Sequence, residues 1–535
     1  MGFISKSKQV WANYTPTERR NIAIYIIGIM FYKFGLEAFN GSITTLAIDR
    51  FGTQAFRKQG LLQGLNQAFQ CVGSILIAPL IKRFPTRSVL AMAVMVFGLL
   101  TAVLMIVDAS TGGRIKRGDE RKPHYGNWNP DGLFPVYCAS GIAYGMVELI
   151  RRVIPRDIVG GDVNKLRRMD AIVHIFYEIA GTVGAFTTTY LVLRFGNNYS
   201  FFITPIFFTC ACILWSFVST LEFQIELEHE QQNYFIQLFQ GAKYFGLSIW
   251  VGAKIIFSNR KFIWLPIGYS MALYGHRYLE NGIAPIIGKQ VFKNSAYSQI
   301  LVGGSNFGEL LGAFSVFILN DFVPTPIPWL RLDSFLVLIV WAFPFYYPPH
   351  NEPKYAWLLA LVFMPISIGW AAGDVSLAAY IQACLARHEN ESDHVSALGA
   401  VMAFLYSTYI LIYAILSPVL GGYVDRFLKN GGTAQDALKN VGGIQFTVIC
   451  AILLASTFIP AGAFAFNPKL LFGEDLTGAL EPQEGKRIED NFEMMDSEKG
   501  GLELPAVQGS HKRGPSFDEK TDMPMAMAQA AHASY

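Results

Sequence analysis

The sequence predicts an all-α membrane protein with twelve transmembrane helices in two six-helix halves. Three observations point to this class. Of the 535 residues, 52% are hydrophobic and only 16% are charged, whereas a soluble domain carries about 25% charged residues. The apolar residues gather in long runs, and the runs of the two halves share short motifs in the same order. One large soluble domain is therefore excluded.

The membrane spans follow from the length of these runs. A helix needs about 20 mostly apolar residues to cross the hydrocarbon core. The runs that come near this length are 21–45, 59–81, 88–107, 132–154, 170–193, 199–219, 262–286, 297–320, 332–348, 355–383, 395–420 and 442–466. The sequence thus predicts six spans on either side of a polar connection.

The chain divides into five regions on this basis. Residues 1–20 form a cytoplasmic N-terminal segment, and residues 21–219 form the first half. Residues 220–261 form a cytoplasmic central loop with a short amphipathic helix at the membrane interface, and residues 262–466 form the second half. Residues 467–535 have charge runs and no apolar periodicity, which is typical of a disordered cytoplasmic tail.

The orientation follows from the basic residues in the connections. Lys and Arg are more frequent in the connections on the side of the N-terminus, above all in 151–168. Cytoplasmic loops carry such an excess. Because the number of spans is even, both termini are predicted to be cytoplasmic. We expect a multi-pass monomer in the plasma membrane rather than in an internal membrane.

The two halves have matching motifs. An Asn-Gly dipeptide at 40–41 matches another at 281–282, and a Leu-Glu pair precedes each of them closely. Segment 61–73 aligns with segment 300–312, so that glycines coincide at both ends. Duplicated halves of this kind are found in secondary transporters, where the substrate lies at the midplane between them.

Over residues 18–466 the chain resembles the major facilitator superfamily. The loop after the second span carries Arg83 and Arg87 where that family has the arginines of its loop signature. Ala78, Lys82 and Pro85 replace the Gly, Asp and second Gly of the signature. The resemblance implies alternating access to a central cavity, with Arg83 and Arg87 in a gating loop. The usual gating salt bridge lacks its Asp here.

Charged residues inside the predicted spans are the candidate functional residues. A charge at membrane depth costs about 2.5–3.5 kcal/mol on insertion scales and usually faces a cavity or a partner. The candidates for a substrate and proton pathway are Lys33, Glu37, His174, Glu178, His276, Arg277, Glu280, Glu309 and Asp374. In three spans, a Lys or His is followed four residues later by Glu, a spacing that places both side chains on one helix face. Such pairs either help the helices to insert or line a polar cavity.

Individual roles follow from the neighbours of each charge. Glu178, with His174 beside it and no Lys or Arg at its depth, is predicted to carry the coupling proton. Glu309 and Asp374 stand alone on their spans and need partners from other helices. Arg151 and Arg152 are expected to anchor the protein to lipid headgroups.

The leading functional hypothesis is a secondary active transporter of a small solute, coupled to protons and without a cofactor. Two alternatives are a non-transporting receptor or scaffold on the same fold, and a metal-ion transporter that uses the His and Glu residues. A membrane-embedded enzyme is not expected, because the sequence offers neither a nucleophile arrangement nor a metal ligand set. No fixed ligand geometry is recognisable for a metal. A net charge of +3 without a basic face gives no sign of a nucleic-acid partner.

Overall fold

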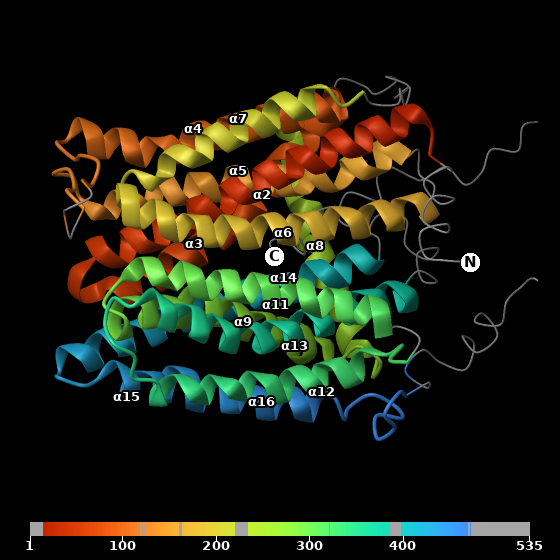
Figure 1. Ribbon diagram of the computed structural model, residues 1–535. Helices are drawn as coiled ribbons and strands as arrows, with labels where there is room; N and C mark the ends of the chain where they lie inside the picture. Colours follow the sequence, from red (N-terminus) through yellow and green to blue (C-terminus); the bar gives the residue numbers. More distant parts are fainter. Residues whose placement is uncertain are drawn as a thin grey trace, which may run out of the picture.

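The computed structural model describes residues 14–117, 120, 123–159, 163–219, 234–319, 322–385, 397–468 and 471. Over these residues the chain is helical, apart from loops and a single β-bridge between Arg114 and His124. Figure 1 shows the long helices side by side, with the first half of the chain above the second. The predicted all-α class is confirmed.

The first half consists of six helices. They are α2 (Pro16–Arg50), α3 (Ala55–Arg83), α4 (Thr86–Ser110), α5 (Leu133–Val159), α6 (Val163–Phe195) and α7 (Ile203–Ser216). The start of α2 is fixed by a capping box: the Thr15 hydroxyl accepts from the Glu18 amide at 3.2 Å, and the Glu18 carboxylate accepts from the Thr15 amide at 2.6 Å. These two bonds satisfy amide groups that have no partner within the helix.

The second half begins with a continuous helix over 266–291. In it, α9 (Ala272–Tyr278) and α10 (Ala284–Ile286) alternate with three π-helical turns. The further helices are α11 (Ser298–Leu319), α12 (Pro326–Leu336), α13 (Pro353–Leu385), α14 (Ala397–Lys429), α15 (Ala434–Leu438) and α16 (Gln445–Ser456). A 3-10 helix extends α12 to Phe345, and a π-helical turn joins α15 to α16.

Each of the twelve predicted spans overlaps a helix. Within the described residues, nine helices are long and apolar enough to cross a membrane. The other three predicted spans correspond to α6, α7 and the 266–291 helix. Of these, α7 has only 14 residues, whereas the other two carry several of the charged side chains considered above.

The last predicted span, 442–466, was misplaced. The helix begins at Ala434 and ends at Ser456. The residues after it are apolar, but Pro460 and Gly462, which has a φ of +73°, do not continue a helix. Hydropathy alone extended the segment past its helical end.

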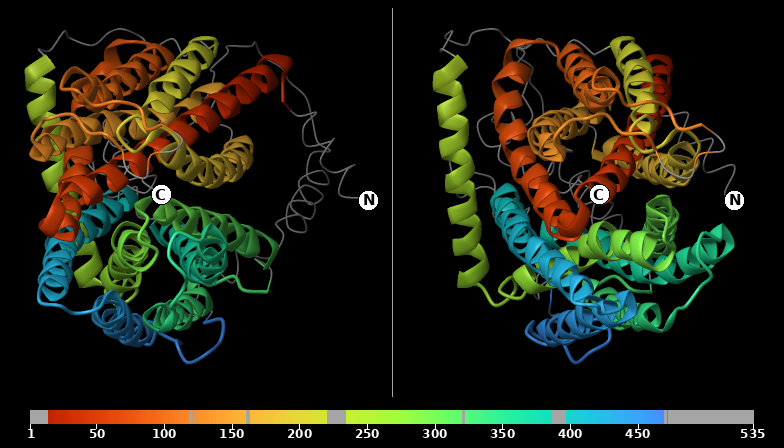
Figure 2. Two further views of the ribbon diagram at one scale, coloured as in Figure 1. Left: turned by 60° about the vertical axis from the view of Figure 1, so that its left-hand side comes forward. Right: turned by 90° about the vertical axis from the view of Figure 1, so that its left-hand side faces the viewer.

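The central connection contains α8 (Tyr234–Ser258), which includes the segment 244–257 expected to be an amphipathic helix. It lies against both halves. The Tyr234 hydroxyl donates to the Leu76 carbonyl of α3 at 3.0 Å, and Gly252 packs on the Ala400 carbonyl of α14. Figure 2 shows α8 alongside both groups of helices. Its outer face exposes Phe239 and Trp250 by 78% and 70%. A position at the membrane interface stays a prediction.

The two halves contact each other most closely along α3 and α14, and again along α6 and α11. Glycines make the first contact possible, since a Cβ atom on Gly60 would lie 2.7 Å from the backbone of Ser417, and one on Gly64 2.9 Å from the Cα atom of Ala414. These positions lie in the N-terminal part of α3 and the C-terminal part of α14. The halves therefore close against each other at the end of the bundle away from the N-terminus.

Within the first half, α3 and α5 approach each other through three glycines. A Cβ atom on Gly141 would lie 2.5 Å from the carbonyl oxygen of Asn66. Cβ atoms on Gly73 and Gly145 would overlap with the carbonyl oxygens of Ile142 and Gln70. Small residues at helix contacts allow such close approach in membranes.

Gly145→Ala is expected to lower the melting temperature of the purified protein, because the new methyl group overlaps with backbone that cannot move away. Gly246→Ala on α8 is the matched control, since nothing lies within 4 Å of its Cβ position. The control should be neutral or stabilising by up to about 1 kcal/mol, the usual gain from Gly to Ala in a helix. Equal melting temperatures for the two variants would contradict the packing argument.

Candidate functional site

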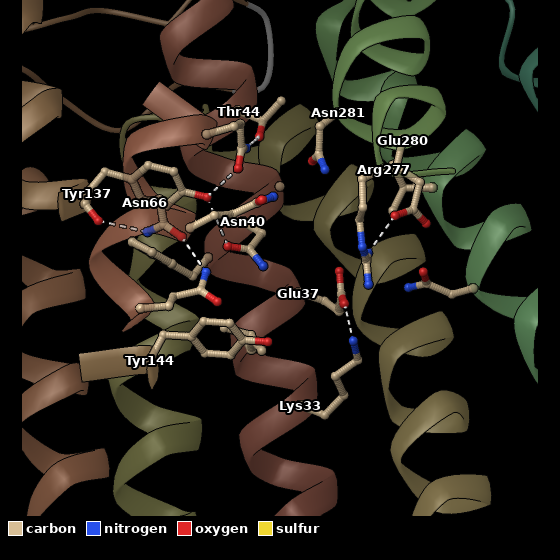
Figure 3. A pocket seen from close by; sticks show the side chains of 18 of the residues that line it. Lys33, Glu37, Asn40, Thr44, Asn66, Tyr137, Tyr144, Arg277, Glu280 and Asn281 are labelled. Carbon is tan, nitrogen blue, oxygen red and sulfur yellow. Dashed lines mark hydrogen bonds and ion pairs between the residues drawn. The ribbon is translucent and has the colours of Figure 1, made fainter. Parts of the chain in front are cut away.

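A polar pocket lies between the two halves, roughly halfway along the helices (Figure 3). Its empty volume, which includes its open part, is about 950 Å³. Residues from α2, α3 and α5 line one side, and residues from the 266–291 helix, α11 and α14 line the other. The polar lining residues are Lys33, Glu37, Asn40, Thr44, Gln63, Asn66, Gln67, Gln70, Tyr137, Tyr144, Arg277, Glu280, Asn281, Gln299, Asn306, Tyr406 and Tyr409.

One ion pair on α2 borders the pocket. The Lys33 ammonium lies 2.5 Å from Glu37 Oε1, and both side chains are buried. The ammonium also lies 4.5 Å from the centroid of the Tyr177 ring. Gly181 and Gly184 of α6 leave room for this pair, because their Cβ atoms would lie 2.6 Å from the Lys33 side chain and 3.0 Å from that of Glu37. The two glycines thus serve to pack α6 against the charged pair.

A second ion pair lies on the opposite side of the pocket. Arg277 Nη1 is 2.8 Å from Glu280 Oε2, and Glu280 lies in the π-helical turn Leu279–Ile283. Figure 3 shows Arg277 and Glu37 pointing toward each other across the pocket. The pocket therefore presents two positive and two negative side chains, one pair from each half of the chain.

Amide and hydroxyl groups form the rest of the first-half wall. The Asn66 amide donates to the Tyr137 carbonyl at 2.8 Å and accepts from Gln70 at 2.8 Å. The Tyr137 hydroxyl donates to Gln63 Oε1 at 3.0 Å. Sequence reasoning missed this wall because it considered only charged residues. The signal was nonetheless present, since polar residues at 63, 66, 67 and 70 recur at helical spacing within a predicted span.

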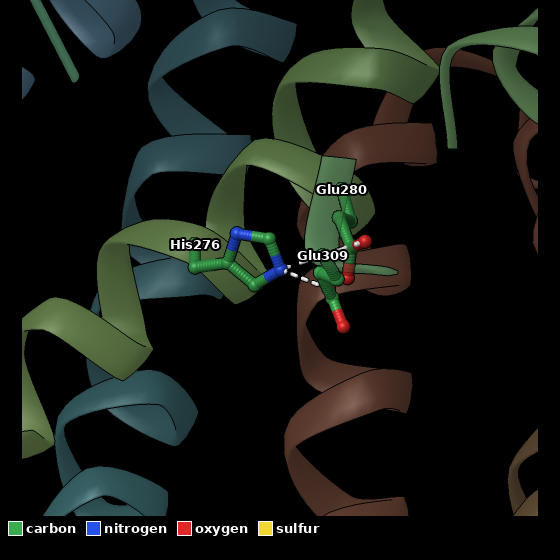
Figure 4. A group of neighbouring side chains, drawn as sticks. All are labelled: His276, Glu280 and Glu309. Atoms are coloured by element: carbon green, nitrogen blue, oxygen red, sulfur yellow. Dashed lines mark hydrogen bonds and ion pairs between the residues drawn. The ribbon is translucent and has the colours of Figure 1, made fainter. Parts of the chain in front are cut away.

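A third cluster lies beside the pocket. His276 Nε2 is 2.5 Å from Glu309 Oε1 of α11 and 3.6 Å from Glu280 Oε1, and all three side chains are buried (Figure 4). The imidazole stacks on Trp370 of α13 at a centroid distance of 5.5 Å and an interplanar angle of 17°. Glu309 was expected to need a partner from another helix, and His276 is that partner. Neither His276 nor Glu309 lines the pocket itself.

The predicted interaction between His174 and Glu178 is not formed, because neither oxygen of Glu178 bonds to His174. Glu178 is buried, and its two carboxylate oxygens have no hydrogen-bond partner among the described residues. His174 is exposed, as are its neighbours Ile175 and Phe176. The four-residue spacing places both side chains on one side of α6, but His174 is exposed and Glu178, one turn later, is buried. Spacing along a helix determines which residues share a side, not how deeply each of them is buried.

Arg151 was wrongly expected to anchor the protein to lipid headgroups. Its side chain is buried and lies 2.6 Å from Glu148 Oε2, and Glu148 also accepts from the Tyr32 hydroxyl at 3.2 Å. The guanidinium is 4.5 Å from the Tyr177 ring, the ring that Lys33 contacts as well. A nearby carboxylate explains the difference, because it makes an inward position less costly than a snorkelling one. The side chain of Arg152 lies outside the described residues.

The remaining predicted residues lie away from the pocket. Asp374 is half-buried on α13 and does not line it. Arg83, the last residue of α3, is exposed. Arg87, in the first turn of α4, donates to the carbonyl of Val218 at 3.2 Å and so joins α4 to the residues after α7 within the first half.

Two polar contacts close the bundle at the end away from the N-terminus. Asp49 forms an ion pair with Lys289 and accepts from Ser295 at 2.8 Å. Asp425 of α14 accepts from the amides of Phe56 and Arg57 at 3.2 and 2.9 Å, at the start of α3. Sequence reasoning missed both contacts, because each joins residues more than 200 positions apart, and no local pattern marks such partners.

Comparisons with known proteins agree with this architecture. The model of the Major Facilitator Superfamily matches residues 22–405. A search of curated protein sequences finds no match. The crystal structure of nucleoside transporter NupG is 13% identical, with a TM-score of 0.52 over 83% of this chain and 100% of that chain. That of a D-xylose-proton symporter is 12% identical, with a TM-score of 0.51 over 80% and 96%.

A third solved structure, a POT family transporter in complex with 5-aminolevulinic acid, is 11% identical, with a TM-score of 0.55 over 82% of this chain and 96% of that chain. At such identities the three structures share the fold with this chain. The match of the family model over most of the chain, together with two six-helix halves around a central polar pocket, shows that the chain belongs to the Major Facilitator Superfamily and is a membrane transport protein.

Proposed function

We propose that the protein is a secondary active transporter that moves a small polar solute by alternating access and couples this movement to protons. The observation that carries the proposal is the pocket between the halves, bordered by a buried ion pair from each of them. A receptor or scaffold on the same fold has no need for such a pocket, and an enzyme would need a nucleophile or cofactor site that the sequence did not reveal. We propose in addition that both termini are cytoplasmic and that the protein is a monomer in the plasma membrane.

The charges favour a zwitterionic solute. Lys33–Glu37 and Arg277–Glu280 are each neutral as pairs, so an added net charge would have no partner left in the pocket. A zwitterion can place its anionic group near Lys33 or Arg277 and its cationic group near Glu37 or Glu280. The total charge of the pocket then stays at zero, which limits the cost of burial. The structural neighbour that binds 5-aminolevulinic acid supports this class.

Alternating access is supported by where the halves touch. With the N-terminus in the cytoplasm, the end closed by Asp49–Lys289 and Asp425 faces outward. The structure then corresponds to an inward-facing state. To open outward, the protein must break these contacts and separate α3 from α14.

Proton coupling is assigned to Glu178. The expectation that no Lys or Arg lies at its depth was wrong: Glu178 lies one turn before Gly181, over which Lys33 packs, and the Lys33 charge acts on it. Burying a carboxylate charge without a hydrogen-bond partner is costly, and binding a proton removes the charge. Among the structural neighbours, one is named a D-xylose-proton symporter, which supports the coupling ion. Movement of α6 between the two states would change the surroundings of Glu178.

The solute class can be tested by thermal shift on the purified protein. A panel of amino acids, short peptides, nucleosides and pentoses should raise the melting temperature only for zwitterionic compounds, because ligands that bind the folded state stabilise it. Arg277→Gln should abolish the shift, whereas Arg117→Gln in an exposed loop should not. A shift given only by nucleosides or pentoses would contradict the zwitterion proposal.

Glu178→Gln should abolish accumulation of the identified solute driven by a pH gradient in proteoliposomes, while solute exchange across the membrane continues. The reason is that a glutamine cannot release a proton but keeps the size of the side chain. Glu37→Gln should instead weaken solute binding, because it leaves Lys33 without its partner. If Glu178→Gln still accumulates solute with an unchanged pH dependence, Glu178 is not the coupling group.

Lys289→Glu should favour the outward-facing state, because it replaces an ion pair with Asp49 by two like charges. A partly exposed pair contributes about 1 kcal/mol, so its loss alone shifts the equilibrium about fivefold. The measure is labelling of a cysteine at Gln63 by a membrane-impermeant maleimide from outside, relative to the protein without that cysteine. The charge-swapped double variant, Asp49→Lys with Lys289→Glu, should restore slow labelling. Equal labelling rates in all variants would refute the gate.

A further inference from the structure

We propose that His276, Glu280 and Glu309 form a binding site for a divalent transition-metal cation such as Zn²⁺. The three side chains come from the 266–291 helix and from α11, and one ligand atom from each lies within 4.8 Å of the others. This inference goes beyond the transport function proposed above and does not depend on the solute.

The ligand atoms suit this class of cation. Zn²⁺ binds imidazole nitrogen at about 2.0–2.1 Å and carboxylate oxygen at about 2.0–2.2 Å, usually in tetrahedral geometry. Ligand atoms in such a site are about 3.3 Å apart. His276 Nε2 lies 3.6 Å from Glu280 Oε1 and 2.5 Å from Glu309 Oε1. A cation would therefore replace the hydrogen bond to Glu309 once Nε2 and Oε1 move apart by about 0.8 Å, and the two carboxylate oxygens, which lie within 4.8 Å of each other, would turn toward it. An imidazole ligand favours Zn²⁺ and similar ions over Mg²⁺ or Ca²⁺.

An unpartnered oxygen is the second observation that points to a cation. Glu280 is only 4% exposed, and its Oε1 has no hydrogen-bond partner among the described residues. Its other oxygen is held by Arg277. Figure 4 shows the carboxylates of Glu280 and Glu309 on the same side of the His276 ring, facing Nε2. A buried carboxylate oxygen that accepts no hydrogen bond is costly, and a bound cation would satisfy it.

The surrounding structure fixes the ligands. Trp370 stacks on the imidazole and restricts its rotation. Arg277 orients Glu280 from the pocket side. The site thus has preformed neighbours of the kind that orient metal ligands in known sites.

The charge balance also permits a dication. With Glu280 and Glu309 ionised and His276 neutral, the three ligands carry two negative charges, which a divalent cation neutralises. Counted together with Arg277, the filled site would carry one net positive charge. Two buried acids lie near enough to offset it, because the charge of Glu178 acts on Glu309 and that of Asp333 acts on His276. Because Glu280 lines the pocket, a cation can enter from there, and a fourth ligand can come from water or from the solute.

The test is metal binding to the purified full-length protein carrying an affinity tag without histidines. Zn²⁺ should raise the melting temperature by a few degrees, and Mg²⁺ should not. Co²⁺, as a spectroscopic probe, should give the visible absorption bands of a four- or five-coordinate complex at one equivalent per protein. The probe needs no variant, so it stays informative if substitutions at buried positions impair folding.

His276→Gln and Glu309→Gln should weaken Zn²⁺ binding at least about tenfold and remove the Co²⁺ bands. His350→Gln and Glu352→Gln are the matched controls, since both residues are exposed and distant in sequence from the cluster. The proposal is overturned if the wild-type protein gives no Zn²⁺-specific shift and no Co²⁺ bands, in which case a proton alone joins His276 to Glu309. It is also overturned if the His276 and Glu309 variants bind Zn²⁺ as tightly as the wild type. Neither result would bear on solute transport.

Discussion

Charge buried within the membrane is the constraint on which this structure depends. Each charged side chain at membrane depth costs several kcal/mol unless it finds a partner or water. Four buried pairs meet this requirement. In three of them both partners lie on the same helix: Lys33 with Glu37, Arg151 with Glu148, and Arg277 with Glu280. The fourth pair, His276 with Glu309, joins two helices. Glycines at 181 and 184 leave the space that the first pair needs. The close packing of α6 against α2 therefore depends on the same glycines that make room for the ion pair.

The two halves use these charges differently. In the first half, Lys33 and Arg151 each lie 4.5 Å from the centroid of the Tyr177 ring, so two ion pairs share contacts with one aromatic side chain. In the second half, π-helical turns interrupt the 266–291 helix, and Glu280 lies in one of them. A π-helical turn rotates the residues after it relative to a regular helix and is frequent at functional sites. Glu280 faces both Arg277 and His276, because residues three and four positions apart share one side of a helix.

Closure at one end and a pocket near the middle follow from where the small residues lie. Gly60, Gly64 and Gly421 permit α3 and α14 to touch near the Asp49 and Asp425 contacts. Deeper in the bundle, the same two helices carry larger polar side chains such as Gln67 and Tyr409, which line the pocket. The same helix pair therefore closes one end of the bundle and lines the pocket. A tilt of one half against the other would open the closed end of this pair and bring its other end together.

The sequence by itself determined the class, the helical segments and most of the charged residues at the site, because the hydrocarbon core imposes length and polarity on every span. It also indicated the pairs Lys33–Glu37 and His276–Glu280, since helical spacing is local. Only the tertiary structure decided which charges meet across helices, as His276 does with Glu309 and Asp49 with Lys289. It likewise decided that His174 is exposed and Arg151 buried. The physical reason is that burial and long-range pairing depend on how helices pack, and the period of a single helix carries no information about its neighbours.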